Sequence, residues 1–228
     1  MTDYSYDLKD VTVRDLNHDL HLEKSDKAQF SVANPNGKHS VAVGARFATS
    51  VKIDGHVGYY CAGMNQQASI EVNGNAGSGL AENIMSGKVR VKGNASQYCA
   101  ATGHGGLVVV DGDTAARCGI SMKGVDIVVG GSVGHMSAFM AQSGRFVICG
   151  DAGDALGDSM YEARIYVGGK VKSTGVDCIE KPMEAEHLEE LKELLERAGM
   201  KDKDASSFKR YGSARTLYNF NIDNAGDY

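Results

Sequence analysis

The chain of 228 residues contains no tryptophan, two prolines, and five cysteines that form no Cys-x-x-C pair. Its net charge of −5 offers no clustered positive charge for sequence-independent binding to nucleic acid. No apolar run approaches the roughly 18 residues of a membrane span, and the start, MTDYSYDLKD, lacks the basic and apolar regions of a signal peptide. An odd number of cysteines fits a reducing compartment. We therefore expect a cytoplasmic protein that binds neither nucleic acid nor membrane.

The dominant feature of the sequence is a repeat with a period of 19 residues, since 74 − 55 = 19 and each later step is equal. Apolar residues recur two and four positions before each repeat glycine, which is the period-2 pattern of a strand with one buried face. The repeat glycines are Gly55, Gly74, Gly93, Gly112, Gly131, Gly150 and Gly169.

A unit of 19 residues is too short for a helix pair and lacks the leucine ladder of leucine-rich repeats. Stacking such units at an inter-strand spacing of about 4.8 Å would pair each backbone group with the coils on either side. The sequence therefore predicts an all-β fold, a parallel β-helix of about seven coils over residues 51–178. We expect the repeat glycine at a bend, because glycine adopts positive φ without strain.

Two other interpretations of the repeat remain open. Left-handed β-helices of hexapeptide acyltransferases have about 18 residues per coil, and 19 is not a multiple of six. The glycines at Gly150, Gly153 and Gly157 resemble a nucleotide-binding fingerprint, but the strand–helix unit which that motif requires does not follow. A structural turn is the better interpretation of these glycines.

Residues 1–50 precede the repeat and should form an α/β cap over its open end. Thr12 and Asp15 have capping-box spacing, and Leu16 and Leu20 would form one face of a short helix. Residues 40–44 are expected to form a short strand.

Residues 179–228 do not follow the 19-residue repeat. Pro182 is placed for the first turn of a helix that Gly199 should end. The aromatic-rich tail that follows is expected to bind a partner subunit or to lock this helix against the coils. The leucines of the expected helix are Leu188, Leu191, Leu194 and Leu195, and the tail anchors are Tyr211, Leu217, Tyr218 and Phe220.

One outward-facing column, three residues before each repeat glycine, changes character along the chain. It begins with the charged residues Lys52, Glu71 and Arg90. It continues with Val109, Val128 and Val147. An apolar stripe on an outer face is normally covered, so we expect either the C-terminal helix or a partner subunit to cover it.

The residues that could act in catalysis or bind a metal do not form a recognised motif. His135 and Asp154 share a column and could form a pair, but no nucleophile accompanies them. Asp151, Asp154 and Asp158 lack the calcium-loop pattern, and the column containing Cys61, Cys99 and Cys118 is typical of a narrow core. We assign no catalytic, cofactor-binding or metal-ligating residue.

The strings NPNGKHSVAVG (34–44), GHVGYYCAGMN (55–65) and GHGGLVVVDGD (103–113) resemble the GXGXG-motif family. That family includes the C-terminal β-helix domain of the glutamate synthase large subunit and one of the subunits of formylmethanofuran dehydrogenase. The chain looks most similar to the β-helix subunit of N-methylglutamate synthase. Literal G-x-G occurs only at Gly77–Gly79 and Gly103–Gly105, so the repeat here is better written G-x-x-G.

The resemblance implies a right-handed β-helix without catalytic residues. It would be a subunit of a hetero-oligomer, bridging a glutamine-amidotransferase-like subunit and a synthase subunit that carries FMN and an iron–sulfur cluster. Another complex of the family, which uses ammonia or formylmethanofuran, remains an alternative. So do a stand-alone binding protein and a carbohydrate enzyme, although the latter would need paired carboxylates and usually stacking aromatics, and tryptophan is absent.

Overall fold

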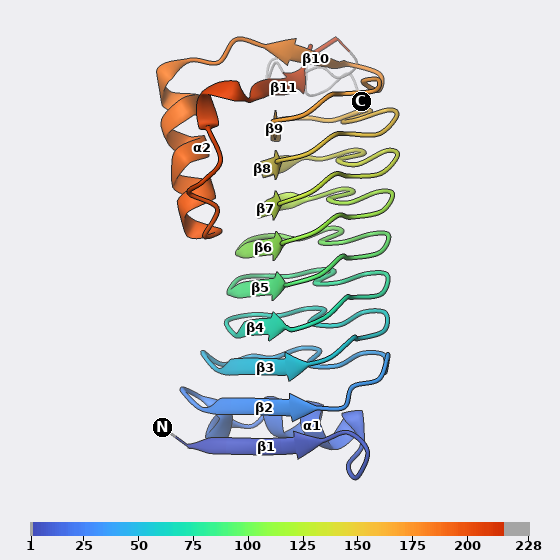
Figure 1. Cartoon of the computed structure of the whole chain (residues 1–228), viewed down its shortest axis with the longest axis vertical. Helices are drawn as coiled ribbons and strands as arrows, with labels where there is room; N and C mark the ends of the chain where they lie inside the picture. Colours follow the sequence, from blue (N-terminus) through green and yellow to red (C-terminus); the bar gives the residue numbers. More distant parts are fainter. Residues whose placement is uncertain (1, 217–228) are drawn as a thin grey trace, which may run out of the picture.

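The computed structural model describes residues 2–216. These residues form one tall stack of coils with a helix at its N-terminal end and a second helix along one side (Figure 1). The strands and helices are β1 (Asp3–Asp7), α1 (Val13–Leu20), η1 (Glu23–Ser25), β2 (Gln29–Ala33), β3 (Ser50–Asp54), β4 (Ser69–Val72), β5 (Lys88–Val91), β6 (Leu107–Val110), β7 (Lys123–Val129), β8 (Ser143–Ile148), β9 (Arg164–Val167), β10 (Cys178–Lys181), α2 (Ala185–Arg197), η2 (Ala205–Ser207) and β11 (Lys209–Ser213).

The predicted parallel β-helix is confirmed. Strands β3 to β9 pair in parallel, each with the next in the chain. Paired residues are 19 positions apart, except where a register shift places Lys123 opposite Ser143. The two apolar columns before the repeat glycines are buried along the whole stack. Among residues 2–216, no helix is long and apolar enough to cross a membrane.

The parallel stack begins earlier than residue 51. Strand β2 pairs in parallel with β3, with Gln29 opposite Ser50, so this first step has 21 residues, 50 − 29. Strand β1 pairs in parallel with β2 and starts the sheet. The segment that the sequence assigns to a cap therefore also supplies the first coil.

The cap itself is built around α1. Thr12 accepts a hydrogen bond from the backbone N–H of Asp15, and the Asp15 carboxylate accepts one from the N–H of Thr12, which completes the predicted capping box. Leu16 and Leu20 are fully buried. Helix α1 thus presents its apolar face to the main core.

The predicted strand over residues 40–44 is wrong. Ser40, Ala42 and Gly44 all have positive φ, and a chain that alternates into this region cannot form a β-strand. The alternation recurs at positions five, seven and nine after the first six repeat glycines, but not after Gly169. Its members from the first two full coils are Tyr60, Ala62, Met64, Gly79, Ala81 and Asn83.

This alternation turns successive N–H groups in opposite directions along the stack. The N–H of Tyr60 donates to Ser78 O in the next coil, whereas that of Ala62 donates to Val41 O in the previous one. A left-handed conformation costs a non-glycine residue about 1–2 kcal/mol. Hydrogen bonds to both neighbouring coils offset that cost, so the stack maintains a backbone that local preference disfavours.

The repeat glycines are needed for close approach rather than for positive φ. Among the seven, only Gly55 has positive φ. The N–H of Gly112 donates to Gly93 O at 3.0 Å, and a Cβ added at Gly112 would lie 2.1 Å from Asn94 Oδ1. Our expectation of a bend that demands positive φ is therefore wrong for six of the seven glycines.

A column of polar side chains follows these glycines. Each side chain accepts a hydrogen bond from the backbone N–H of the equivalent residue one coil later, at 2.7–2.9 Å. The acceptors are His56, Asn75, Asn94, Asp113, Ser132 and Asp151. This polar ladder satisfies N–H groups that the strands do not reach, and it brings the side-chain oxygens against the glycines.

The C-terminal end departs from the parallel pattern. Strand β11 pairs antiparallel with β9, and β10 pairs antiparallel with β11 and forms the edge of the sheet. Helix α2 begins at Ala185 with Glu184 as its N-cap, so the placement of Pro182 in the first turn is wrong. Gly199, with φ of +72°, follows the C-cap Ala198 and ends the helix as predicted.

We expect Gly112→Ala to lower the free energy of unfolding by about 1–3 kcal/mol, because the new methyl group would overlap Asn94 Oδ1. Urea denaturation of Gly112→Ala, Asn94→Ala and the double variant would measure this. The double variant should be less destabilised than the sum of the single ones, because Asn94→Ala removes the overlapping oxygen. An unchanged midpoint for Gly112→Ala would contradict the steric argument.

Candidate interface

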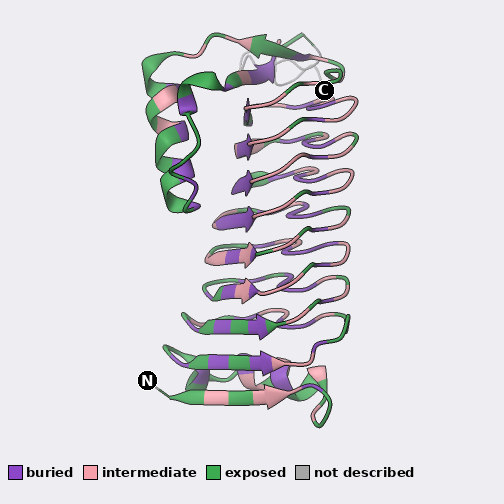
Figure 2. Cartoon of the chain, in the orientation of Figure 1, coloured by how far each residue is buried: buried purple, intermediate pink, exposed green. Residues whose placement is uncertain are grey.

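The apolar outer column is covered by α2. Val109, Val128 and Val147 are fully buried, and they form a second core together with Leu191 and Leu194 of the helix. In Figure 2 the inward side of α2 and the strands beside it are coloured as buried, whereas β3 alternates between buried and exposed residues. The chain's own helix, rather than a partner, covers this stripe in the structure.

The change from charged to apolar residues in this column coincides with the end of the helix. Arg90, the last charged member, donates from Nη1 to Ala198 O at 2.8 Å. Lys88 Nζ donates to Arg197 O at 3.3 Å. Cations beside the last carbonyl groups of a helix stabilise it through hydrogen bonds and the helix dipole. Strand β5 therefore fixes where α2 ends along the stack.

Charged groups beside the second core hold α2 in place. Asp126 is 7 % exposed and accepts two hydrogen bonds from Arg145, from Nε at 2.7 Å and from Nη2 at 2.6 Å. It accepts a third from Arg197 of the helix at 3.0 Å. This carboxylate, shared by two guanidinium groups, links strand β8 and helix α2 through charge-assisted hydrogen bonds.

A second ion pair fixes the other half of α2. Glu190 lies 2.8 Å from Arg164 Nη2 and accepts a hydrogen bond from the Tyr166 hydroxyl at 2.5 Å. Burial, followed by this hydrogen bond, raises the pKa of Tyr166. The phenol therefore stays protonated and remains a donor to the helix.

The tail anchors fall into two groups. Tyr211 lies in β11, is 7 % exposed, and belongs to the main core rather than to the core beneath α2. It therefore helps to close the end of the stack and does not lock α2 onto the valine column. Leu217, Tyr218 and Phe220 lie outside the described residues, and their role as partner contacts stays a prediction.

The acidic residues that could have formed a site are used between coils. Asp154 accepts a hydrogen bond from Lys172 Nζ at 2.7 Å, and Asp151 accepts one from the N–H of Lys170. Asp158 accepts one from the N–H of Val176 at 3.2 Å. His135 lies near enough to contribute to the lowered pKa of Asp154, whose main cause is the hydrogen bond from Lys172. The arrangement is that of ladder contacts.

The cysteine column lies in the core. Cys61, Cys99 and Cys118 are fully buried and unpaired. Burial raises the pKa of Cys61 to about 12. The hydrogen bond with Cys118, together with burial, raises the pKa of Cys99 well above its usual range. These thiols act as small apolar side chains that fill the narrow coil.

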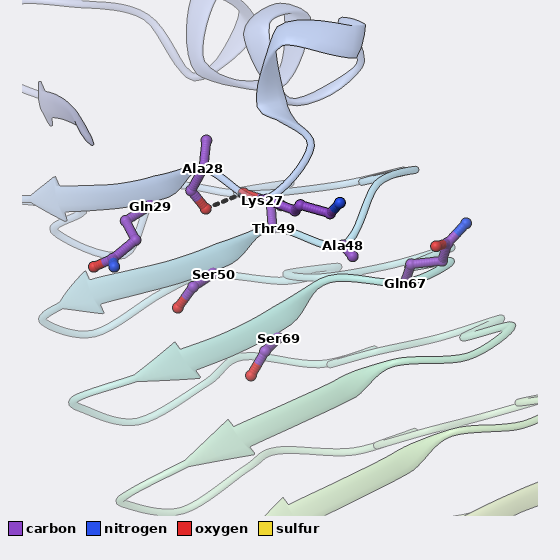
Figure 3. A pocket seen from close by; sticks show the side chains of 8 residues that line it. All are labelled: Lys27, Ala28, Gln29, Ala48, Thr49, Ser50, Gln67 and Ser69. Carbon is purple, nitrogen blue, oxygen red and sulfur yellow. Dashed lines mark hydrogen bonds between the residues drawn. The ribbon is translucent and has the colours of Figure 1, made fainter. Parts of the chain in front are cut away.

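A shallow hollow of about 460 Å³ opens where β2, β3 and β4 begin (Figure 3). Its polar lining groups are the amides of Gln29 and Gln67, the hydroxyls of Thr49, Ser50 and Ser69, and the ammonium of Lys27. None of these lining side chains is a carboxylate, thiol or imidazole, so the hollow contains no general acid–base pair.

One group of residues 2–216 has metal-like spacing, namely Glu184, Glu186 and His187 at the start of α2. Two of its three residues already serve the helix, because Glu184 and His187 form a capping box. His187 Nδ1 accepts a hydrogen bond from the N–H of Glu184 at 3.4 Å. Helix capping therefore accounts for Glu184 and for Nδ1 of His187.

Comparison with known proteins places these features in a family context. The chain is 62 % identical over 224 residues to the protein GlxC of Rhizobium meliloti (strain 1021), covering 97 % of this chain and 98 % of that protein. No protein-family model matches the chain.

We expect Leu194→Ala to loosen α2 without unfolding the coils. Leu194 is fully buried in the second core, and removing such a side chain typically costs about 2–5 kcal/mol. Hydrogen exchange should show faster exchange in α2, with β3–β5 unchanged. The exposed Lys192→Ala is the matched control. Equal acceleration in β3–β5 would contradict the view that α2 docks as a separate unit.

We expect Cys61, Cys99 and Cys118 to be unreactive toward DTNB in the folded protein at pH 8, because all three are fully buried and the reagent must reach a thiolate. A thiol pKa raised above the unfolded value of about 8.5 contributes stability that is fully present below that pH. For Cys61 this contribution is lost as the pH rises toward about 12. Thiol titration and circular dichroism from pH 7 to 11 would test this. Rapid modification of all three thiols at pH 8 in the folded protein would contradict it.

Proposed function

This chain belongs to the family of the protein GlxC, and we propose that it is a non-catalytic structural subunit of a glutamate-synthase-like complex. The observation that carries the proposal is the fold. The strings that resemble the GXGXG family form the stacked parallel coils that the resemblance implies.

The structure favours a rigid spacer for physical reasons. Each coil is hydrogen-bonded to the next through strands, left-handed segments and the polar ladder. Such a stack resists bending and shear, because any displacement breaks several bonds at once. A rigid spacer would keep two catalytic partners at a fixed separation.

The reaction that we propose for the complex is N-methylglutamate synthesis, in which glutamate and methylamine yield N-methylglutamate and ammonia. A glutamine-amidotransferase-like subunit and a synthase subunit with FMN and an iron–sulfur cluster would be the partners. The five free cysteines support a cytoplasmic location for this chain. Candidate acids such as Asp151 and Asp154 are engaged between coils, which supports placing catalysis in the partners.

Co-purification of the native protein tests this proposal. Recovery with an amidotransferase-like chain and a flavoprotein, together with methylamine-dependent consumption of glutamate, is the expected result. Ammonia in place of methylamine as the preferred amine would keep the scaffold role and change the reaction. A chain recovered alone that hydrolyses polysaccharide would overturn the proposal.

We expect the triple substitution of Leu217, Tyr218 and Phe220 by alanine to weaken assembly of the complex by at least tenfold. Buried aromatic anchors typically dominate binding energy, and the stacked coils support one another without these residues. Assembly would be measured by titrating the partners, and stability by urea denaturation. Alanine at Lys201, Asp202 and Lys203, which are exposed, is the control. Unchanged assembly would remove the tail from the interface.

A further inference from the structure

A second hollow, of about 250 Å³, opens where β10 and β11 meet the start of α2. Its lining contains four permanently cationic side chains, Arg164, Lys181, Arg210 and Arg215, against one carboxylate, Glu162. This excess of positive charge contrasts with the net charge of −5 for the whole chain. Neither the repeat nor the proposed scaffold role accounts for it.

Two of these cations lie directly opposite each other in the sheet. Lys181 of β10 pairs with Arg210 of β11 in the antiparallel register. Like charges at opposed positions repel and destabilise a strand pair. Both side chains are half-buried, so water screens this repulsion less than it would at an open surface.

Two nearby carboxylates pair with arginines, whereas Glu186 lies beside His187 with its side chain exposed. Glu162 lies 2.7 Å from Arg215, and Glu190 pairs with Arg164 at 2.8 Å. Arg210 donates from Nε to Pro182 O at 2.9 Å, and its terminal nitrogens have no hydrogen-bond partner among residues 2–216. Neither Lys181 nor Arg210 has an ion-pair partner among residues 2–216.

A buried donor completes the lining. His187 is 7 % exposed, and because its Nδ1 accepts the N–H of Glu184, the ring proton lies on Nε2. The nearest carboxylate oxygen to Nε2, on Glu186, is 3.7 Å away, which is too far for a hydrogen bond. Lys181 lies over Gly212, where an added Cβ would be 3.6 Å from Lys181 Cγ.

We propose that this hollow binds a small oxyanion, a carboxylate or phosphate group, held by Lys181, Arg210 and the Nε2–H of His187. A guanidinium fork and an ammonium suit such oxygens, and an anion between them turns a repulsive cross-strand pair into a stabilising one. The oxyanion has two possible sources, a free small molecule or the carboxylates of Asp223 and Asp227, which lie outside the described residues.

The test uses the full chain. Thermal unfolding and isothermal titration are measured with sodium phosphate or sodium acetate, and sodium chloride at equal ionic strength is the reference. Wild-type protein should show a saturable rise in Tm with at least one of the two oxyanions. Lys181→Gln/Arg210→Gln should weaken binding at least tenfold, while the neighbouring Lys209→Gln should change it less than twofold. Because Lys181→Gln relieves repulsion, we expect it to raise Tm in chloride and to lower it at saturating oxyanion, relative to wild type.

A second pair of variants distinguishes the sources. If Asp223 and Asp227 supply the oxyanion, wild-type protein will not respond, and Asp223→Asn/Asp227→Asn will bind the added oxyanion. The control is Asp3→Asn/Asp10→Asn, which removes the same number of charges at the far end of the stack. The proposal is overturned if neither wild type nor Asp223→Asn/Asp227→Asn binds phosphate or acetate, or if binding survives in Lys181→Gln/Arg210→Gln.

Discussion

The close approach of neighbouring coils along the glycine columns is the constraint on which the rest of this structure depends. At Gly112 the backbone N–H reaches Gly93 O directly, and the oxygen of Asn94 occupies the space that a side chain would fill. This spacing lets each strand pair with its neighbours and lets the polar ladder run unbroken. It also stabilises left-handed residues such as Ala62 and Tyr60, whose conformations are unfavourable in isolation.

Helix α2 adds a second core to a fold whose first core is narrow. The coils alone would expose the valine column, and the helix covers it where the column is apolar and ends where Arg90 and Lys88 meet its last carbonyl groups. Asp126 and Glu190 then fix the helix in place. On the strands that precede β5, the outer face of the sheet carries charged or polar residues such as Lys52. No element of the described chain covers this face. A partner would therefore meet a surface of defined shape rather than a mobile helix.

A scaffold role agrees with how the polar residues are used. His56, Asn75, Asp113 and Asp151 are the kinds of residue that serve in active sites, yet here they link coil to coil. The hollow around Lys181 and Arg210 is the exception, because its charges are not balanced within residues 2–216. It lies beside β10, at the edge of the sheet, so the proposed anion site is at one end of the stack of coils.

The 19-residue period determined the parallel β-helix, its buried columns and its register, because a repeat without insertions allows one stacking. Local signals likewise determined the capping box at Thr12 and the end of α2 at Gly199. The sequence left open what covers Val128, since an apolar stripe does not name its partner, and only tertiary packing assigned it to α2. It also placed a strand at residues 40–44 and positive φ at the repeat glycines. The strand is absent, and among the repeat glycines only Gly55 has positive φ, because contacts between coils rather than local preference decide the backbone there. The opposition of Lys181 and Arg210 was equally invisible, because an antiparallel pairing of distant strands creates it.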